Sequence, residues 1–256
     1  MRKAVSLARM ELRRNFRGPV GFAVAGLFLL VHGIYFVSLL ENYSGASFMA
    51  INASQTPARL NLVDAVLQPL ASGDTFLLLL LLPGLTMRLL SEEWRSGTSE
   101  LLLSYPLRDF DIILGKFLAA ATMLAGLLVL SLLAPLCASV FGAVELPTVF
   151  SQLLGLLLFG LSCLALGTVF SALTANQILA YGATVVVLFS SWFLGWWSQN
   201  LFGIWAEVTG WMSLATHFNP TSYGLIQLSD LVYFCGITAF LLYLATSILN
   251  SRRSGG

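Results

Sequence analysis

Most of the side chains that could do chemistry lie in one stretch, SEEWRSGTSELLLSYPLRDFDIILGK, which covers residues 91–116. Its adjacent carboxylates, Glu92 and Glu93, resemble the glutamate motif of an intramembrane protease. That motif requires an arginine where this chain has Gly97. It also requires histidines in the membrane, and the chain has only two histidines in all. A protease is therefore the weaker alternative, and we interpret His32 as a packed polar residue rather than a ligand.

The other catalytic motifs are incomplete. Ser162, within Gly160–Cys163, has no histidine in the last apolar segment to act as its base. The pattern G-x-x-x-x-G-K-[ST] of a phosphate-binding loop is missing, because Gly115-Lys116 is followed by Phe117 and lacks the upstream glycine. The three cysteines form no C-x-x-C pair and are interpreted as small apolar packing residues. We therefore expect no catalytic residue, no metal and no cofactor bound by this chain.

The composition predicts a membrane protein. Of 256 residues, 57% are hydrophobic and 10% are charged, whereas soluble domains have about 45–50% and 25%. A spanning helix needs about 20 mostly apolar residues. Six stretches qualify: Val20–Leu40, Leu70–Leu90, Ile112–Leu133, Phe150–Thr174, Ile178–Trp197 and Leu231–Leu249. The predicted fold class is an all-α, polytopic integral membrane protein with six transmembrane helices, in a single domain over residues 1–256.

The second span is the least regular, with Asp74 and Arg88 near its ends and Pro83 inside it. We expect both charged side chains to reach the membrane interface and the proline to kink the helix. The central parts of the spans hold no Asp, Glu, Lys or Arg. This pattern disfavours an ion-driven or proton-driven carrier, because such carriers keep ionisable groups near the middle of the membrane.

The basic residues predict the orientation of the chain. Twelve of the 13 basic residues lie on one side of the membrane if the chain crosses it six times: Arg2, Lys3, Arg9, Arg13, Arg14, Arg17, Arg88, Arg95, Arg108, Lys116, Arg252 and Arg253. By the positive-inside rule, both termini and the loop between the second and third spans are cytoplasmic. In this interpretation Lys116 snorkels from the third span to the cytoplasmic interface. The 12 acidic residues nearly balance the basic ones, so the net charge does not point to nucleic acid.

The segment before the first span is amphipathic. One helical face of residues 1–19 carries apolar side chains and the rest carries arginines; the apolar positions are Val5, Ala8, Leu12 and Phe16. We expect an amphipathic helix on the inner leaflet. The alternative is a frayed basic anchor that only sets the topology.

Two loops on the opposite side of the membrane are also amphipathic. The first favours a short interfacial helix through Leu60, Leu62, Val63, Val66 and Leu67. The second has apolar side chains at helical spacing, namely Phe202, Trp205, Val208, Trp211 and Met212. It fits equally a re-entrant pair of helices that caps a pathway and an interfacial aromatic anchor.

The loop between the second and third spans predicts a very short helix. Gly97 should end the preceding helix, and Thr98 can cap the next one. Glu100 suits the first turn, three leucines (Leu101, Leu102 and Leu103) make the helix apolar, and Pro106 stops it. Because so short a helix is marginal in water, the membrane surface or a partner protein must cover it. The preceding carboxylates, Glu92 and Glu93, are either a solvated helix end or a contact for basic residues of that partner.

The pattern Glu-Glu-x-x-x-Gly-Thr-x-Glu-Leu-Leu-Leu-x-x-Pro, followed by Ile-Ile-Leu-Gly-Lys-Phe, resembles the signature of membrane permeases of type-two ABC exporters. The matching positions are Glu92, Glu93, Gly97, Thr98, Glu100, Leu101, Leu102, Leu103, Pro106, Gly115 and Lys116. Within these exporters the chain is most similar to the gliding-motility-associated branch, whose relatives include the permease of nitrous oxide reductase maturation. His217-Phe218, residues 230–234 and the closing Arg252-Arg253 also agree, so the resemblance covers essentially the whole chain.

The resemblance implies a permease subunit of an ABC transporter in the bacterial inner membrane. The Thr98–Tyr105 segment, with Arg95 beside it, would be a coupling helix that docks on a cytoplasmic ABC ATPase. ATP and Mg²⁺ would bind to that ATPase. A second permease copy or a related permease, membrane lipids and a protein with a periplasmic domain are the other candidate partners, and nucleic acid is not one. Trp205, Trp211, His217 and Phe218 would belong to the outer re-entrant region. An ATP-driven mechanical transmitter that moves no cargo remains an alternative.

Overall fold

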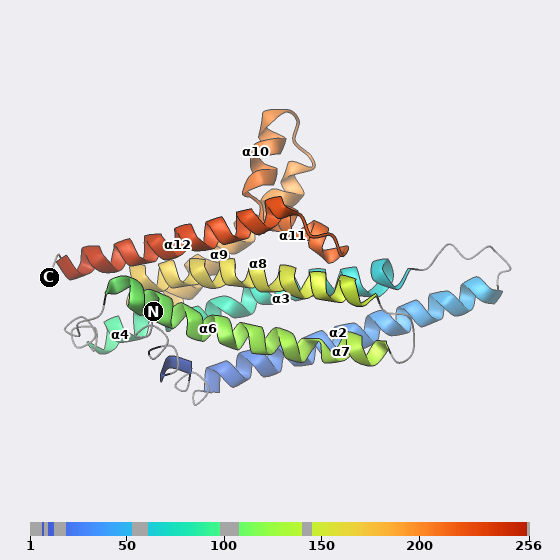
Figure 1. Ribbon diagram of the computed structural model, residues 1–256, viewed down its shortest axis with the longest axis horizontal. Helices are drawn as coiled ribbons and strands as arrows, with labels where there is room; N and C mark the ends of the chain where they lie inside the picture. Colours follow the sequence, from blue (N-terminus) through green and yellow to red (C-terminus); the bar gives the residue numbers. More distant parts are fainter. Residues whose placement is uncertain are drawn as a thin grey trace.

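The computed structural model describes residues 7, 10–12, 19–52, 61–97, 108–139 and 145–254. The secondary structure of these residues is helical, and six of their helices are long and apolar enough to cross a membrane. Most of these helices run along the long axis of the molecule (Figure 1). The chain is therefore a multi-pass, all-α membrane protein, as the composition predicts.

The described helices follow one another without any intervening strand. In chain order they are α2 (Pro19–Asn52), η1 (Val63–Leu67, a π-helical turn), α3 (Gln68–Thr86), α4 (Ser91–Ser96), α6 (Asp109–Ser131), α7 (Leu133–Ala138), α8 (Leu146–Leu173), α9 (Gln177–Ser198), α10 (Ile204–Met212), α11 (Leu214–Ser222) and α12 (Leu228–Ser254). Each predicted span lies, to within a residue, inside one of the six segments that are long and apolar enough to cross a membrane. The second spanning segment is longer than predicted, because η1, α3 and α4 continue it from Val63 to Ser96.

Helix α8 lies at the centre of the bundle, in contact with α3, α6, α9, α11 and α12. Small residues on α8 permit this close packing: a Cβ added at Gly160 would lie 2.6 Å from a Leu124 methyl carbon of α6. Phe159, which is fully buried, places its ring against those of Trp192, Phe218 and Phe234. The central helix therefore touches both the helices that precede it and those that follow it in the chain.

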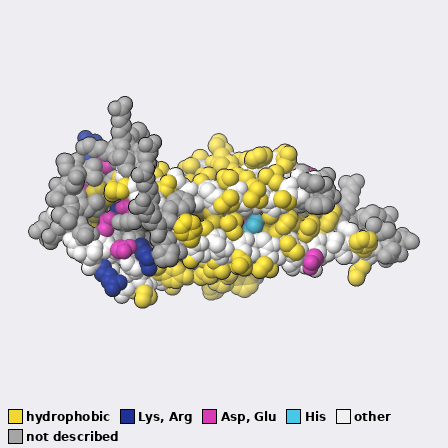
Figure 2. Space-filling model, turned by 90° about the horizontal axis from the view of Figure 1, so that it is seen from below, with side chains coloured by type: hydrophobic (Ala, Val, Ile, Leu, Met, Phe, Trp, Pro, Cys, Tyr) yellow, Lys and Arg dark blue, Asp and Glu magenta, His cyan; other side chains and the backbone are white. Residues whose placement is uncertain are grey.

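The surface is divided between apolar and charged regions. Figure 2 shows hydrophobic side chains over the middle of the bundle, with Lys, Arg, Asp and Glu side chains gathered near one end. We call this end, which carries α4, the first turn of α6 and the last turn of α12, the terminal end (Figure 1). Helices α2, α9 and α12 keep wide exposed apolar faces, which include Ile34, Val186 and Val232. Such faces are expected of helices that contact lipid.

The predicted interfacial helix between the first two spans is part of the bundle instead. Val63, Val66 and Leu67 form η1, are all buried, and continue directly into α3. Their side chains pack against residues of α2 and α3 and against Val149 of α8. The prediction was wrong because a run of apolar residues has the same pattern on the membrane surface and inside a bundle. Leu60 lies outside the described residues.

The structure describes only part of the N-terminal segment, and the predicted amphipathic face on the inner leaflet stays a prediction. In its described part, Leu7 and Glu11 are buried, Met10 is exposed and Leu12 is half-buried. The other predicted face positions, Val5, Ala8 and Phe16, lie outside the described residues. The carboxylate of Glu11 therefore points into the bundle, where it pairs with Lys116.

Candidate functional site

The second span breaks just before the terminal end. Helix α3 runs through Pro83, ends at Thr86, and is followed by a turn and then by α4. The hydroxyl of Ser171 on α8 accepts hydrogen bonds from the backbone amides of Leu90 and Ser91, at 3.0 and 3.2 Å. These amides would otherwise be unpaired at a helix start. One serine of the central helix thus holds α4 in place.

Helix α4 ends at Gly97, as the sequence predicts. Gly97 has a φ of 72°, the left-handed conformation that glycine adopts at helix ends without steric cost. The next helix on the far side of the loop, α6, begins at Asp109, with Asp109 and Asp111 in its first turn, where carboxylates favour the helix dipole. The predicted coupling helix, with Thr98, Glu100, Leu101, Leu102, Leu103 and Pro106, lies outside the described residues and stays a prediction.

A buried ionic cluster joins the two sides of this loop. The ammonium nitrogen of Lys116, on α6, lies 2.6 Å from a carboxylate oxygen of Glu93 on α4 and 2.9 Å from one of Glu11 in the N-terminal segment. The Lys116 side chain has no exposed surface, and those of Glu11 and Glu93 are 3% and 12% exposed. We refer to these three residues as the lysine cluster. It brings together segments that are up to 105 residues apart in sequence.

The lysine cluster corrects two predictions. Lys116 does not snorkel to the interface, because carboxylates inside the bundle pair with its ammonium group. Glu93 is not a solvated residue at the end of the second span, because α4 turns its side chain into the bundle. Its neighbour Glu92 and the nearby Arg95 are exposed, as predicted. Gly115, beside Lys116, is also buried. Removing three charged groups from water is costly, so their mutual pairing must compensate for the lost hydration.

The C-terminal arginines attach α12 to the same end. Arg253 donates to Asp109 at the start of α6, with 2.9 Å between nitrogen and oxygen. The guanidinium of Arg252 lies 4.8 Å from the ring centre of Trp94 on α4, a cation–π contact, and donates to the carbonyl of Leu173. The terminal end therefore connects α4, α6, α8 and α12 through charged side chains.

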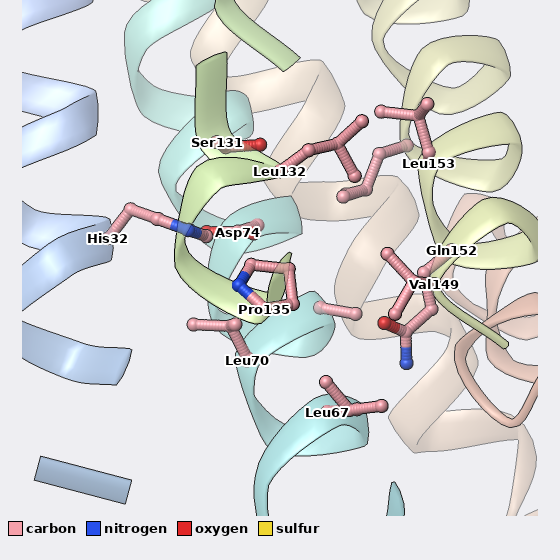
Figure 3. A pocket seen from close by; sticks show the side chains of 12 residues that line it. His32, Leu67, Leu70, Asp74, Ser131, Leu132, Pro135, Val149, Gln152 and Leu153 are labelled. Carbon is pink, nitrogen blue, oxygen red and sulfur yellow. The ribbon is translucent and has the colours of Figure 1, made fainter. Parts of the chain in front are cut away.

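A second polar pair lies inside the bundle and was missed by the sequence analysis. The Nδ1 atom of His32 on α2 is 2.8 Å from a carboxylate oxygen of Asp74 on α3, and both side chains are about 5% exposed or less. Figure 3 shows the two side chains meeting between their helices. His32 is a packed polar residue, as predicted, but Asp74 does not reach the interface. The signal was available: the first span contains a histidine and the second an aspartate, and each of these polar side chains needs a partner inside the membrane.

A third polar pair lies at the other end of α12. His217 of α11 places Nδ1 2.8 Å from Asp230 of α12 and Nε2 3.2 Å from the carbonyl oxygen of Trp211. Its ring stacks on that of Tyr233, with centroids 3.8 Å apart. Because the carbonyl can only accept, Nε2 donates the second hydrogen bond. Both ring nitrogens of His217 therefore have partners.

The predicted outer region consists of two short helices with different surroundings. Helix α10 has no buried residue, and Trp205 and Trp211 on it are 69% and 67% exposed. Helix α11, in contrast, buries His217 and Phe218 and packs against α8 and α9. The structure brings Trp211 and His217 together, with ring centroids 5.7 Å apart. Whether this pair of helices caps a pathway remains a prediction.

The described polar clusters do not form a metal centre. Among the residues that the structure describes, no group of three His, Cys, Asp or Glu side chains could hold a metal ion. The lysine cluster and the two His–Asp pairs each join different helical segments.

Comparison with known sequences agrees with this architecture. No curated protein sequence matches the chain. The model of the ABC-2 family transporter protein family matches residues 70–251, which begins in the second span and includes the four spans that follow it. The match covers well over half of the chain. With its six apolar helices and its charged terminal end, the chain belongs to the ABC-2 transporter family and is a transport membrane subunit.

Proposed function

We propose that this chain is the permease subunit of an ABC exporter, driven by ATP hydrolysis on a separate cytoplasmic ATPase. Family membership supports the proposal, since ABC-2 permeases generally pair with a cytoplasmic ABC ATPase. A second copy or a related permease would complete the membrane part. The terminal end would face the cytoplasm of a bacterial cell, because 12 of the 13 basic residues belong to that side.

The observation that carries the proposal is the lysine cluster. Glu93 precedes residues 98–107 and Lys116 follows them, and the ion pair between the two fixes the segments on both sides of the loop. Glu11 adds the N-terminal segment to the same assembly. A force applied to the loop would therefore move α4 and α6 together instead of being absorbed by loop bending.

The packing offers a path from this assembly into the membrane. Helix α6 and α3 both contact α8, and α8 contacts α11 and α12. Closure of two ATPase subunits against the loops of two permeases would therefore be passed to the central helix of each one. We expect the pair of permeases to alternate between inward-facing and outward-facing or laterally open states.

The first prediction tests the coupling. In a complex purified with its candidate ATPase, Leu102→Arg in the predicted coupling helix should lower both ATPase co-purification and ATP turnover at least about tenfold, because a charge replaces an apolar docking residue. Glu207→Gln, at an exposed position of α10 away from the terminal end, is the control and should change neither quantity (Figure 1). If Leu102→Arg leaves complex formation and turnover intact, the coupling role is wrong.

A further inference from the structure

Among the residues that the structure describes, no other charged side chain lines the cavity beside the His32–Asp74 pair. Counted along α2 at 1.5 Å per residue, His32 lies about 20 Å from Pro19, which places it well inside a bilayer about 30 Å thick. Phe28 stacks against its ring, with centroids 5.8 Å apart. The surrounding side chains are mostly apolar, as Figure 3 shows for Leu67, Leu70, Leu132 and Val149.

A small cavity adjoins the pair. Its volume is about 30 Å³, and besides His32 and Asp74 its polar lining residues are Ser131 of α6 and Gln152 of α8. A cavity of more than about 10–15 Å³ with several polar partners can hold a water molecule. The Nε2 atom of His32 is buried and has no hydrogen-bond partner among the described residues. A water in this cavity would satisfy at least part of that unmet hydrogen bonding.

The charge of the pair depends on a single proton. A neutral His32 beside an ionised Asp74 leaves one net negative charge in apolar surroundings. One added proton makes the pair neutral overall, whether it is held on the imidazole or on the carboxyl group. Because an uncompensated charge inside a membrane protein is costly, uptake or loss of this proton changes the energy of holding α2 against α3.

Other titratable groups on the neighbouring elements do not compensate for this charge. The side chains that line the cavity from η1, α3, α6, α7 and α8 include no titratable group besides Asp74. On α2, the Tyr35 ring packs against Gly73, next to Asp74 in the chain. Asp64 of η1 is exposed, and so is Glu145 before α8.

From this geometry we propose that His32, Asp74 and the adjoining cavity form a proton-binding site of the permease. The ligand is a proton taken from water through the cavity and returned to it, with no other bond made or broken. Gln152 extends the polar lining toward α11, since its side-chain amide donates to the carbonyl of Ser222 at 2.7 Å. The inference does not depend on the ATPase or on the direction of transport, because the full chain alone contains the complete site.

Nitrogen-15 NMR of histidine-labelled full-length chain in lipid nanodiscs tests the site directly. The chain has two histidines, so the signals lost in His32→Gln identify His32. We expect the signals of the His32 ring nitrogens to change reversibly with pH, because the site gains and loses one proton. In Asp74→Asn the midpoint of this change should differ from that of the wild-type chain, because the carboxylate that shares the proton is gone.

The matched control is Asp230→Asn, which removes the same kind of partner from His217 and should leave the His32 midpoint where it is. Either of two results overturns the proposal. One is a His32 signal that stays constant across the pH range in the wild-type chain, a measurement that needs no variant to fold. The other is an unchanged midpoint in Asp74→Asn.

Discussion

The two ends of α12 use buried charge in different ways. At the terminal end, Lys116 joins residues that are 105 and 23 positions away from it in the chain, and its side chain has no exposed surface. At the other end of α12, His217 of α11 pairs with Asp230, only 13 positions away in the chain, and its ring stacks on Tyr233. Both of these partners lie on α12. The first arrangement connects remote segments, whereas the second sets the local angle between α11 and α12.

The largest expected effect comes from breaking the remote connection. Lys116→Met should lower the free energy of unfolding by about 3–5 kcal/mol, because it removes the buried cation that pairs with both carboxylates. Denaturant unfolding of the full chain in lipid nanodiscs measures the difference. The triple variant Glu11→Gln, Glu93→Gln and Lys116→Met removes all three charges and should recover most of the loss. An unchanged stability in the single variant would show that the cluster does not connect the segments.

A smaller effect is expected at the local pair. His217→Phe keeps an aromatic ring to stack on Tyr233 but loses both hydrogen bonds, to Asp230 and to the Trp211 carbonyl. The loss should be about 1–3 kcal/mol in the same unfolding assay, the usual cost of leaving a buried polar partner unsatisfied. A loss equal to that of Lys116→Met would remove the distinction between the two ends.

The smallest effect is expected from the arginine near the end of α12. The side chain of Arg253 is 38% exposed, so solvent weakens its ion pair with Asp109. Arg253→Gln should therefore cost no more than about 1 kcal/mol, and added salt should reduce even that difference. Parallel unfolding curves at low and high ionic strength test both points. A loss that persists unchanged at high salt would assign Arg253 a role closer to that of Lys116.

The spans could be predicted because their signal is local. A helix in lipid must be apolar over most of its length, so its hydropathy marks it without any knowledge of its neighbours. The end of α4 at Gly97 was also readable, since helix ends follow from short-range backbone chemistry. The fold class and this helix end thus follow from neighbouring residues alone, whereas α6 begins at Asp109, three residues before the predicted third span.

The polar partners could not be predicted in the same way. A lysine near the end of a span has the same sequence pattern whether it points to the interface or into the bundle. Lys116 points inward because Glu93 and Glu11 lie on the segments packed beside it, and sequence spacing does not show which segments those are. For Asp74 the sequence did contain a usable hint, in His32, the histidine of the preceding span.

The order of the lysine cluster along the chain has a consequence for biogenesis. Both carboxylates, Glu11 and Glu93, precede Lys116, and a ribosome releases the N-terminal part of a protein first. When the third span leaves the translocon, the counter-charges of its lysine have already been synthesised. The nascent lysine can therefore be neutralised as it partitions into the bilayer, and α6 need never enter lipid as an isolated cationic helix.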